Sequence, residues 1–255
     1  MNYITSPISK QRRFIQSLIN SETKPEKHQY SDVISIPDYL EKTYWWAYVR
    51  PYAIKFWDRP WLINLILLGN FVKLRDLALD ALGSNIHGHI LQIACVYGDF
   101  SLKLAQRLSP GSSLDVLDVV PAQLENVRRK LFPSDSVRLL QRDSTALKIE
   151  DESYDQTILF FLLHEMPAEV REKTLSEALR VLKPGGKLII VDFHKPTSLN
   201  PFRYLYPPFF KVFEPFALDI WRQSIEEWLP KDFVPAEITK QTLCAGIYQK
   251  VVIQK

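Results

Sequence analysis

The first group of residues suited to chemistry lies in the segment HILQIACVYGDFS, residues 89–101. An apolar run is followed at once by a polar turn and the amphipathic segment GDFSLKLAQRL, which predicts a strand opening into a helix. Nucleotide-type cofactors commonly bind at such turns, where glycines let the backbone approach the ligand. This turn keeps only Gly98, and Val96 and Tyr97 stand where close approach is expected. The pattern indicates a cofactor turn that is either lost or rebuilt for different chemistry.

Two acidic residues follow the next two apolar runs. Asp118 ends the run in LDVLDVV, and Asp143 follows the run in LLQRDSTAL. In dinucleotide-binding folds an acid at the first position accepts hydrogen bonds from ribose hydroxyls, and the second position lies beside the adenine. Either acid alone is more often a helix cap or a solvated charge. Together with the strand–turn–helix before them, they favour a nucleoside pocket.

A second group of candidate residues follows the fourth and fifth runs. In LLHEMP, His164 and Glu165 would point to opposite sides of a continuing strand, so at most one is expected to face a ligand. His164 suits a general base or an imidazole metal ligand, and a loop histidine with a structural role is an equal alternative. Asp192 and His194 share a face if extended and form a second candidate pair.

The elements that must position these residues alternate along the chain. Apolar runs that predict buried strands lie at 89–95, 113–117, 137–141, 156–162 and 187–193, with two further strands near 236–243 and 246–253. Helical spacing marks DFSLKLAQRL, PAQLENVRRKL and PAEVREKTLSEALRVL between them, and KPGG at 183–186 predicts a turn after the third. Such alternation predicts an open α/β sheet with its ligand at the carboxyl ends of the strands.

The preceding region is predicted to be helical. Asp38 suits a helix cap, with Glu41 three residues on, and Pro51 and Pro60 should each restart a helix. The domain boundaries that follow are a mobile basic segment at 1–35, an aromatic helical cap at 36–85, and an α/β domain at 86–255 with an aromatic lid insertion at 200–222.

Two later segments carry a resemblance to a known family. VRLLQRDSTALKIEDESYDQTILFFLLHEMP and EALRVLKPGGKLIIVDFHKP resemble the later motifs of class I S-adenosylmethionine (SAM) methyltransferases, especially quinone C-methyltransferases. QIACVYGD and YWWAYVRPYAIKFWDRPWLINLILLGNF resemble the rhodoquinone biosynthesis family RquA. That family replaces a ring methoxy group of ubiquinone with an amino group taken from SAM, assisted by manganese.

The resemblance implies a fold, a cofactor and a set of site residues. The fold is a class I SAM-methyltransferase-like, Rossmann-like, mostly parallel seven-stranded sheet with an N-terminal helical cap. The implied cofactor contacts are Gln92, Ala94, Val96, Tyr97, Gly98, Asp118, Val119, Asp143 and Ser144. His164 and Tyr97 are the implied catalytic residues, and His164, Asp192 and His194 are candidate manganese ligands.

The residue at position 92 gives the rebuilt turn a physical meaning. Ordinary SAM methyltransferases have an acid where Gln92 stands, and its charge favours the protonated α-amine of the cofactor. An amino donor must instead present a neutral nitrogen, and removal of a nearby carboxylate lowers the pKa of the amine. Val96 and Tyr97 fill space that glycines would leave open, which would shift the methionine end of the cofactor.

The aromatic residues of the cap suggest contact with a membrane. Between 44 and 61, eight aromatic side chains are interleaved with Arg50, Lys55 and Arg59, a pattern that suits a membrane interface, although packing of a helical cap explains part of it. No apolar run is long enough to span a bilayer. Ubiquinone resides in the bilayer, so peripheral contact is expected.

Composition bounds the remaining alternatives. The net charge of +3 is too small to indicate a nucleic-acid partner, and Cys95 and Cys244 give no disulfide framework or metal spacing. Lys10, Arg12 and Arg13 precede the first acid, Glu22, as in a basic tail or a mitochondrial transit peptide. The expected location is the cytoplasmic face of a bacterial inner membrane, with the matrix side of the mitochondrial inner membrane as the alternative.

The rival functions are an ordinary quinone methyltransferase and a non-catalytic assembly protein of quinone biosynthesis. The sequence leaves the oligomeric state open.

Overall fold

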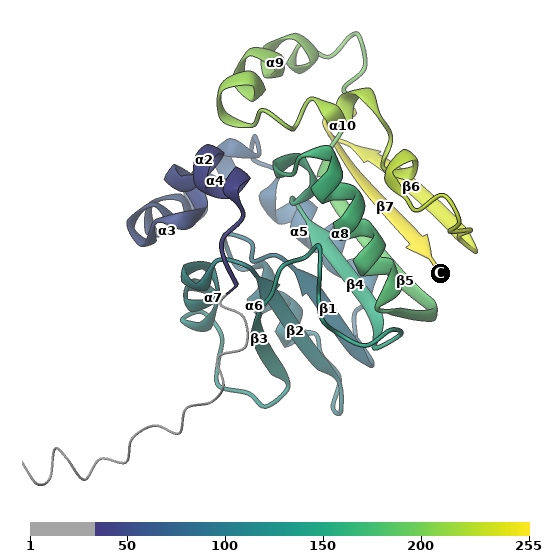
Figure 1. The fold of residues 1–255 in the computed structure, drawn as a ribbon. Coiled ribbons are helices and arrows are strands. Elements are labelled where there is room, and N and C mark those ends of the chain that lie inside the picture. The colour runs from purple at the N-terminus through teal and green to yellow at the C-terminus, as the bar shows by residue number, and fades with distance from the viewer. Residues whose placement is uncertain (1–33) are drawn as a thin grey trace, which may run out of the picture. The chain divides into compact units, whose positions relative to one another are not determined.

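A computed structural model describes residues 34–255, and the expected mobile segment lies almost wholly outside them (Figure 1). Seven strands form one sheet in the order β3-β2-β1-β4-β5-β7-β6. The strands are β1 His89–Ile93, β2 Ser113–Asp118, β3 Val137–Gln141, β4 Tyr154–Phe160, β5 Leu182–Phe193, β6 Glu237–Leu243 and β7 Tyr248–Gln254. The first five are parallel and β7 runs antiparallel to its neighbours β5 and β6, so the predicted mostly parallel seven-stranded sheet is confirmed.

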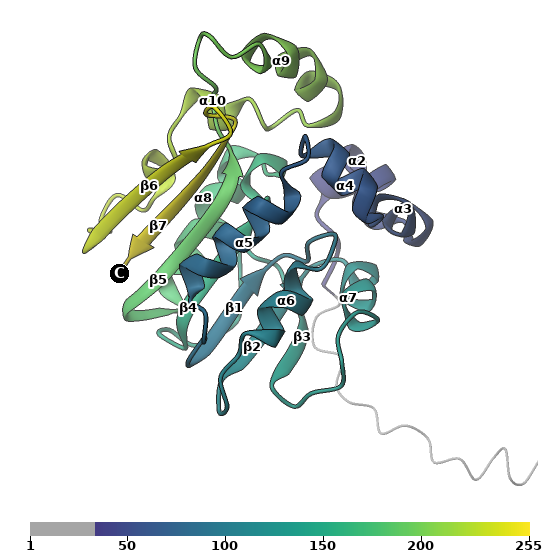
Figure 2. The ribbon, with the colours of Figure 1, turned by 180° about the vertical axis from the view of Figure 1, so that it is seen from behind.

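Helices cover both faces of the sheet because its central strands are apolar on both sides. One face packs against α5 (Phe71–Leu82) and α6 (Phe100–Gln106), in a core that includes Phe100 and Phe160 (Figure 2). The opposite face packs against α8 (Ala168–Arg180), α10 (Asp219–Arg222) and η3 (Ile225–Trp228). α7 (Pro121–Arg128) follows β2. Central strands buried on both faces explain why they appear in the sequence as continuous apolar runs.

The cap consists of short helices, two of which begin at Pro51 and Pro60 as predicted. α2 (Asp38–Thr43) and the π-helix η1 (Trp45–Val49) are followed by α3 (Pro51–Trp57) and α4 (Pro60–Ile66), in which each proline is the first helical residue. The predicted Asp38 cap is wrong, because Pro37 precedes α2 and the Asp38 carboxylate instead pairs with Lys42 at 2.6 Å.

Several element boundaries differ from the prediction. β1 ends at Ile93 because Ala94 has a φ of +71°, and β4 ends at Phe160 because Phe161 has a φ of +54°. The KPGG segment lies within β5 and not in a separate turn, and the register of β5 against β4 is irregular there. α5 packs against the sheet, and residues 34–255 form one compact unit.

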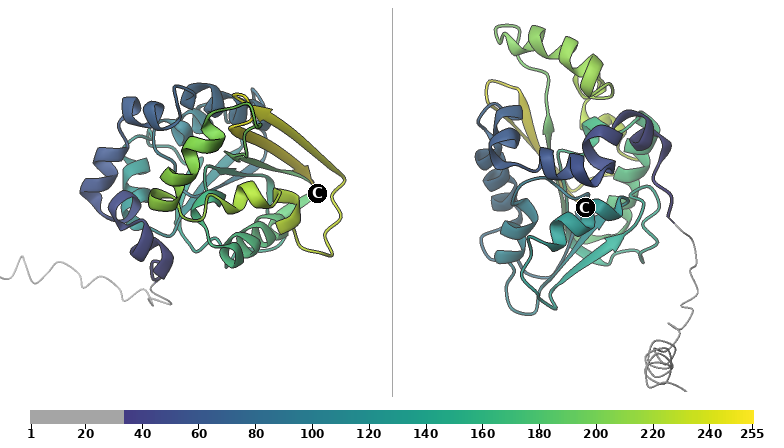
Figure 3. Two further views of the ribbon diagram at one scale, coloured as in Figure 1. Left: turned by 90° about the horizontal axis from the view of Figure 1, so that it is seen from above. Right: turned by 90° about the vertical axis from the view of Figure 1, so that its left-hand side faces the viewer.

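The predicted insertion forms a helix above the carboxyl ends of the strands. α9 (Phe202–Phe213) lies over this edge, and α2–α4 lie beside it (Figures 1 and 3). Among the described helices, none has the length and apolar character needed to cross a bilayer.

Candidate cofactor and substrate site

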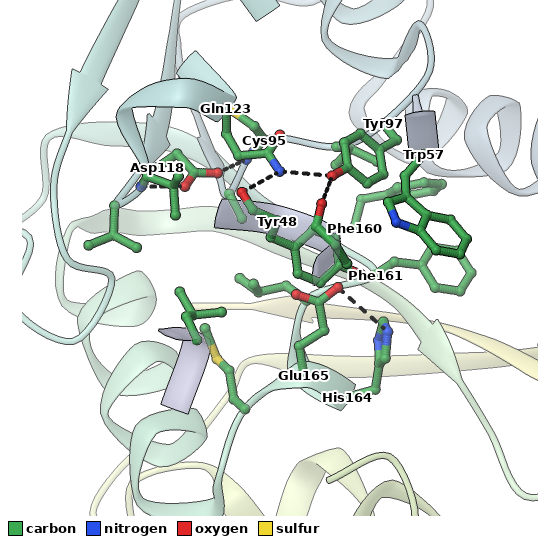
Figure 4. A pocket seen from close by; sticks show the side chains of 18 of the residues that line it. Tyr48, Trp57, Cys95, Tyr97, Asp118, Gln123, Phe160, Phe161, His164 and Glu165 are labelled. Carbon is green, nitrogen blue, oxygen red and sulfur yellow. Dashed lines mark hydrogen bonds and ion pairs between the residues drawn. The ribbon is translucent and has the colours of Figure 1, made fainter. Parts of the chain in front are cut away.

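A cavity of about 330 Å³ lies at the carboxyl ends of β1, β2 and β4 (Figure 4). Its walls come from the turn after β1, the ends of β2 and β4, the cap and α9. Of the predicted site residues, the lining includes Ala94, Val96, Tyr97, Asp118, Val119, Asp143, Ser144 and His164. The sheet therefore brings most of the candidate residues to one cavity, at the edge where open α/β sheets bind ligands.

Gln92 lies behind the wall of this cavity. Its side chain is fully buried, and Nε2 donates a hydrogen bond to the carbonyl oxygen of Ala94 at 3.0 Å. Oε1 has no hydrogen-bond partner among the residues that the structure describes. The glutamine thus supports the turn from beneath with an uncharged group, where a carboxylate would face a carbonyl oxygen.

Gly98 also lies outside the cavity lining, and its backbone is hydrogen-bonded to the cap. Asp58, in the link between α3 and α4, accepts a hydrogen bond from the Gly98 N–H at 2.7 Å. Lys130 donates to the Gly98 carbonyl oxygen at 2.8 Å and pairs with Asp58 at 2.6 Å. A Cβ at position 98 would lie 2.6 Å from Phe71 Cζ, and φ is +84°, so only glycine fits. We call Asp58, Lys130 and Gly98 the latch.

Tyr97 is fixed by the cap as well. Its hydroxyl donates to the Ala47 carbonyl oxygen and accepts a hydrogen bond from Gln123 Nε2 at 3.2 Å (Figure 4). Its ring stacks on Tyr48 with 5.7 Å between centroids. Burial raises the pKa of Tyr97, so its phenol stays protonated. These contacts give Tyr97 a role in shaping the wall, and they occupy the hydroxyl that was expected to act in catalysis.

Asp118 lies at the end of β2 with both oxygens facing the turn. Oδ2 accepts from the Cys95 N–H and Oδ1 from the Val120 N–H, each at 2.8 Å. Burial raises the pKa of Asp118 to about 6, and the backbone hydrogen bonds oppose this rise. Each carboxylate oxygen can still accept a further hydrogen bond, so the position remains suited to ribose hydroxyls.

The next strand end supplies two smaller polar groups. Asp143 Oδ1 accepts from the backbone N–H and the hydroxyl of Thr145, both at 2.8 Å, which closes a tight turn at the cavity wall. The Ser144 hydroxyl lies 2.9 Å from that of Thr174. Asp143 and Ser144 thus add polar groups to the cavity lining at the end of β3.

The chain is similar to known methyltransferases. A family model described as a methyltransferase domain matches residues 90–186. The demethylmenaquinone methyltransferase of Staphylococcus aureus strain JH9 is 28% identical over 174 residues, covering 68% of this chain and 70% of that protein. Among solved structures, the N-methyltransferase NodS of Bradyrhizobium japonicum WM9 with S-adenosyl-L-homocysteine has a TM-score of 0.52 at 14% identity, covering 79% of this chain and 90% of its own. A SAM-dependent methyltransferase from Aquifex aeolicus has a TM-score of 0.52 at 18% identity, covering 80% and 98%.

The chain has a SAM-dependent methyltransferase-like fold. It is related in sequence to a quinone methyltransferase, and the low identities of the solved structures support the fold alone. In this methyltransferase-like fold, the turn after β1 and the acids after β2 and β3 form one side of the cavity. The segment after β4 forms the other side.

The methyltransferase-like cavity contains a titratable cluster after β4. The chain there forms η2 (Leu163–Glu165) and not a continuing strand, so His164 and Glu165 both line the cavity. The expectation that only one would face a ligand is therefore wrong. His164 Nδ1 hydrogen-bonds Asp192 Oδ1 at 2.8 Å, and Nε2 lies 3.8 Å from Glu165 Oε1 (Figure 4). Glu214, which follows α9, lines the same cavity.

Charge and burial set the protonation of this cluster. Burial alone would lower the pKa of His164, but the Asp192 carboxylate, with Glu214 and Glu165, raises it to about 9. Burial raises the pKa of Glu165, while His164 opposes the rise and Glu214 adds to it. Burial also raises the pKa of Glu214, whose Oε2 has no hydrogen-bond partner within residues 34–255. The carboxylates around His164 therefore favour its protonated form, and burial makes Glu165 and Glu214 hold their protons more readily than exposed carboxyls do.

The manganese candidates do not meet at one point. Asp192 accepts hydrogen bonds from His164 Nδ1 and from the backbone N–H groups of Leu163, His164 and Phe193, which occupy both of its oxygens. His194 Nδ1 donates to the Gly246 carbonyl oxygen at 2.9 Å and lies outside the cavity lining. Across residues 34–255, no three His, Cys, Asp or Glu side chains lie in an arrangement that could hold a metal ion. These residues do not fit a manganese site made by the chain alone.

Arg171 of α8 holds the η2 turn from below. It is fully buried, and its guanidinium donates to the carbonyl oxygens of Leu163 at 3.0 Å and Met166 at 2.8 Å. The guanidinium also stacks on the Trp228 ring at 4.1 Å. The sequence analysis missed Arg171, Asp58 and Glu214. Arg171 lies in the helix after η2, whereas Asp58 and Glu214 act on the site from distant elements. The aromatic insertion contains two acids, Glu214 and Asp219, and this scarcity could have drawn attention to Glu214.

Proposed function

We propose that the chain binds SAM and converts ubiquinone to rhodoquinone, with the α-amine of SAM as the source of the amino group. The observation that carries this proposal is the uncharged Gln92 amide beneath the cofactor turn, combined with Asp118 and Asp143 at the nucleoside side. The part of the cavity that would hold the nucleoside of SAM keeps its acids, whereas the turn that would hold the methionine end is altered. This combination supports a reaction at the methionine end of SAM.

The proposal has a specific electrostatic basis. A carboxylate at position 92 would stabilise the ammonium form of the cofactor, whereas the Gln92 amide gives no such stabilisation. Gly98 cannot offer its N–H to the carboxylate of the cofactor, because Asp58 already accepts that hydrogen bond. Both features favour a methionine end that is displaced from the turn and an amine that loses its proton more easily.

The first chemical step is a substitution on the quinone ring. The neutral nitrogen adds to the methoxy-bearing carbon, the C–O bond breaks, and the nitrogen's proton leaves with methoxide as methanol. Because both side chains line the cavity, His164 and Glu165 are our candidates to supply a proton to the departing oxygen and to receive the one from nitrogen. Release of the amino group is then an elimination. A proton leaves the β-carbon of the cofactor remnant, a double bond forms between its α- and β-carbons, and the N–Cα bond breaks with its electron pair moving to nitrogen, which takes up a proton.

The cavity walls suit a flat, apolar substrate. Trp46, Trp57, Phe161 and Phe213 all line the cavity. Aromatic side chains of this kind pack well against a quinone ring. The resemblance also implies manganese, but the described residues offer it no ligand set, so the protein groups alone carry the steps derived above.

Methylation of a quinone is the second candidate, and the staphylococcal relative favours it. The purified protein should be incubated with short-tailed ubiquinone and SAM carrying nitrogen-15 on its α-amine, with and without manganese. Amination gives a product in which one methoxy group is replaced by a labelled amino group. Methylation of a demethylated quinone leaves the label on S-adenosylhomocysteine, and that result would overturn the amination proposal. Absence of any product in both reactions would favour the assembly protein.

A further inference from the structure

Large exposed apolar side chains are concentrated in two segments. Of those in residues 34–255, all but Phe132 and Val234 belong to the cap or to the segment around α9. The members are Trp45, Tyr52, Phe56, Trp61, Leu65, Ile66, Leu68 and Val72 from the cap, and Leu199, Tyr204, Leu205, Phe209, Val212 and Phe213 from the α9 segment. We call these residues the docking surface. Contiguous apolar patches on soluble proteins commonly mark interaction sites.

Among residues 44–72 and 195–213, the exposed charged side chains are all basic. Arg50, Lys55, Arg59 and Lys211 are exposed. The only acid between 44 and 72 is Asp58, which is paired with Lys130, and residues 195–213 contain none. A surface of apolar side chains with basic groups and no free acid is complementary to a layer that is apolar inside and anionic at its face.

The docking surface continues into the cavity. Ile66, Phe209 and Phe213 are exposed and also line the cavity wall. Trp46 of the cap meets Phe213 of α9 edge-on, with 5.8 Å between ring centroids, so the two segments join at the mouth. Figure 3 shows α9 and the cap helices at the same edge of the sheet. An apolar chain leaving the cavity here would pass between side chains of both segments.

We propose that the docking surface binds the face of a bilayer containing anionic lipids and opens the cavity toward it. The cap and α9 insert their apolar side chains among the lipids, while the four basic residues contact the headgroups. The biological role of bilayer binding rests on the proposed function, since a quinone with an isoprenoid tail resides in the bilayer. The binding itself follows from the apolar and charged residues and needs no turnover.

Vesicle sedimentation tests this directly. The full chain is mixed with phosphatidylcholine vesicles, with or without phosphatidylglycerol, in the absence of substrate and cofactor. We expect about tenfold or more tighter binding when phosphatidylglycerol is present, because each basic residue near the surface adds attraction. The double variant Lys55→Glu/Lys211→Glu should remove this preference, whereas Lys173→Glu on α8 should keep it.

The apolar contribution has its own matched variants. Trp61→Ser/Leu65→Ser in the cap and Leu205→Ser/Val212→Ser in α9 should each weaken vesicle binding by about tenfold or more, since each removes two inserted side chains. Phe132→Ser/Val234→Ser removes equally exposed apolar groups from elsewhere and should bind as the unchanged protein does. Circular dichroism of each variant checks that it is folded.

Three results would overturn the proposal. The unchanged protein could stay in the supernatant with both kinds of vesicle, or all three apolar variants could bind alike. The protein could also self-associate without vesicles, with the cap and α9 variants turning monomeric, in which case the surface joins copies of the chain. The labelled assay with short-tailed ubiquinone in detergent uses no vesicles. It can therefore fail or succeed independently of this test.

Discussion

Arg171 offers a sharp test of how the η2 turn is held. In Arg171→Met a neutral side chain of similar length replaces the buried guanidinium. The Met166 carbonyl oxygen then loses its donor, and the Leu163 carbonyl oxygen keeps only the Met166 N–H at 3.3 Å. The unsatisfied Met166 carbonyl costs about 1–3 kcal/mol, the hydrogen bond lost at Leu163 about 0.5–1 kcal/mol, and loss of the stack on Trp228 about 1–2 kcal/mol. Relief of the buried, unpaired charge offsets part of this. We expect the free energy of unfolding to fall by about 2–5 kcal/mol.

Urea-induced unfolding followed by circular dichroism measures this difference. Arg128→Met is the matched control, because Arg128 is 66% exposed and pairs only with Glu125 on the same helix, so its loss should cost about 0.5 kcal/mol or less. If Arg171→Met were as stable as the control, the carbonyl contacts would contribute little and the η2 turn would be held by apolar packing alone.

Four further predictions concern the site. Asp118→Asn should weaken SAM binding by about 1–3 kcal/mol in calorimetry, and unchanged affinity would remove this residue from the ribose site. Gln92→Glu should keep SAM affinity but move amination to higher pH, because the added charge keeps the amine protonated; an unchanged pH profile would contradict this. His164 should titrate near pH 9 by NMR, and Asp192→Asn should lower this pKa. Because the pKa is raised in the folded state, protonation of His164 contributes its full stabilisation below about pH 6.5. This stabilisation is lost as the pH rises through 9. Asp58→Asn should lower stability by about 1–2 kcal/mol in urea unfolding, since its lysine partner is partly exposed, and an unaltered midpoint would speak against the latch.

The fold could be predicted because it depends on local patterns. Strands buried on both faces require continuous apolar runs, and the prolines at 51, 60 and 121 occupy first helical positions that need no backbone donor. The predicted strand ends were wrong at Ala94 and Phe161, where a positive φ ends the strand. Alanine and phenylalanine rarely adopt a positive φ, so the sequence gives no sign of it.

The site was only partly predictable for a different reason. Asp118, Asp143 and His164 stand at strand ends, where topology alone brings them together. Arg171 lies in a helix with many charged residues, a composition typical of a solvent-exposed helix. In the folded chain the Arg171 side chain is nevertheless buried by tertiary contacts. Asp58 acts on a glycine forty positions away. Such partners depend on tertiary packing, which spacing along one chain does not encode.

The latch has a thermodynamic consequence. Asp58 belongs to the cap, whereas Gly98 and Lys130 belong to the cofactor side of the sheet, so an ordered cap and an ordered cofactor turn share one set of hydrogen bonds. Any ligand that orders one side then lowers the entropic cost of ordering the other. The coupling free energy must be reciprocal: if SAM tightens quinone or lipid binding at the cap by some factor, the quinone or lipid tightens SAM by the same factor. The order in which the two ligands bind then has no effect on the stability of the complete complex.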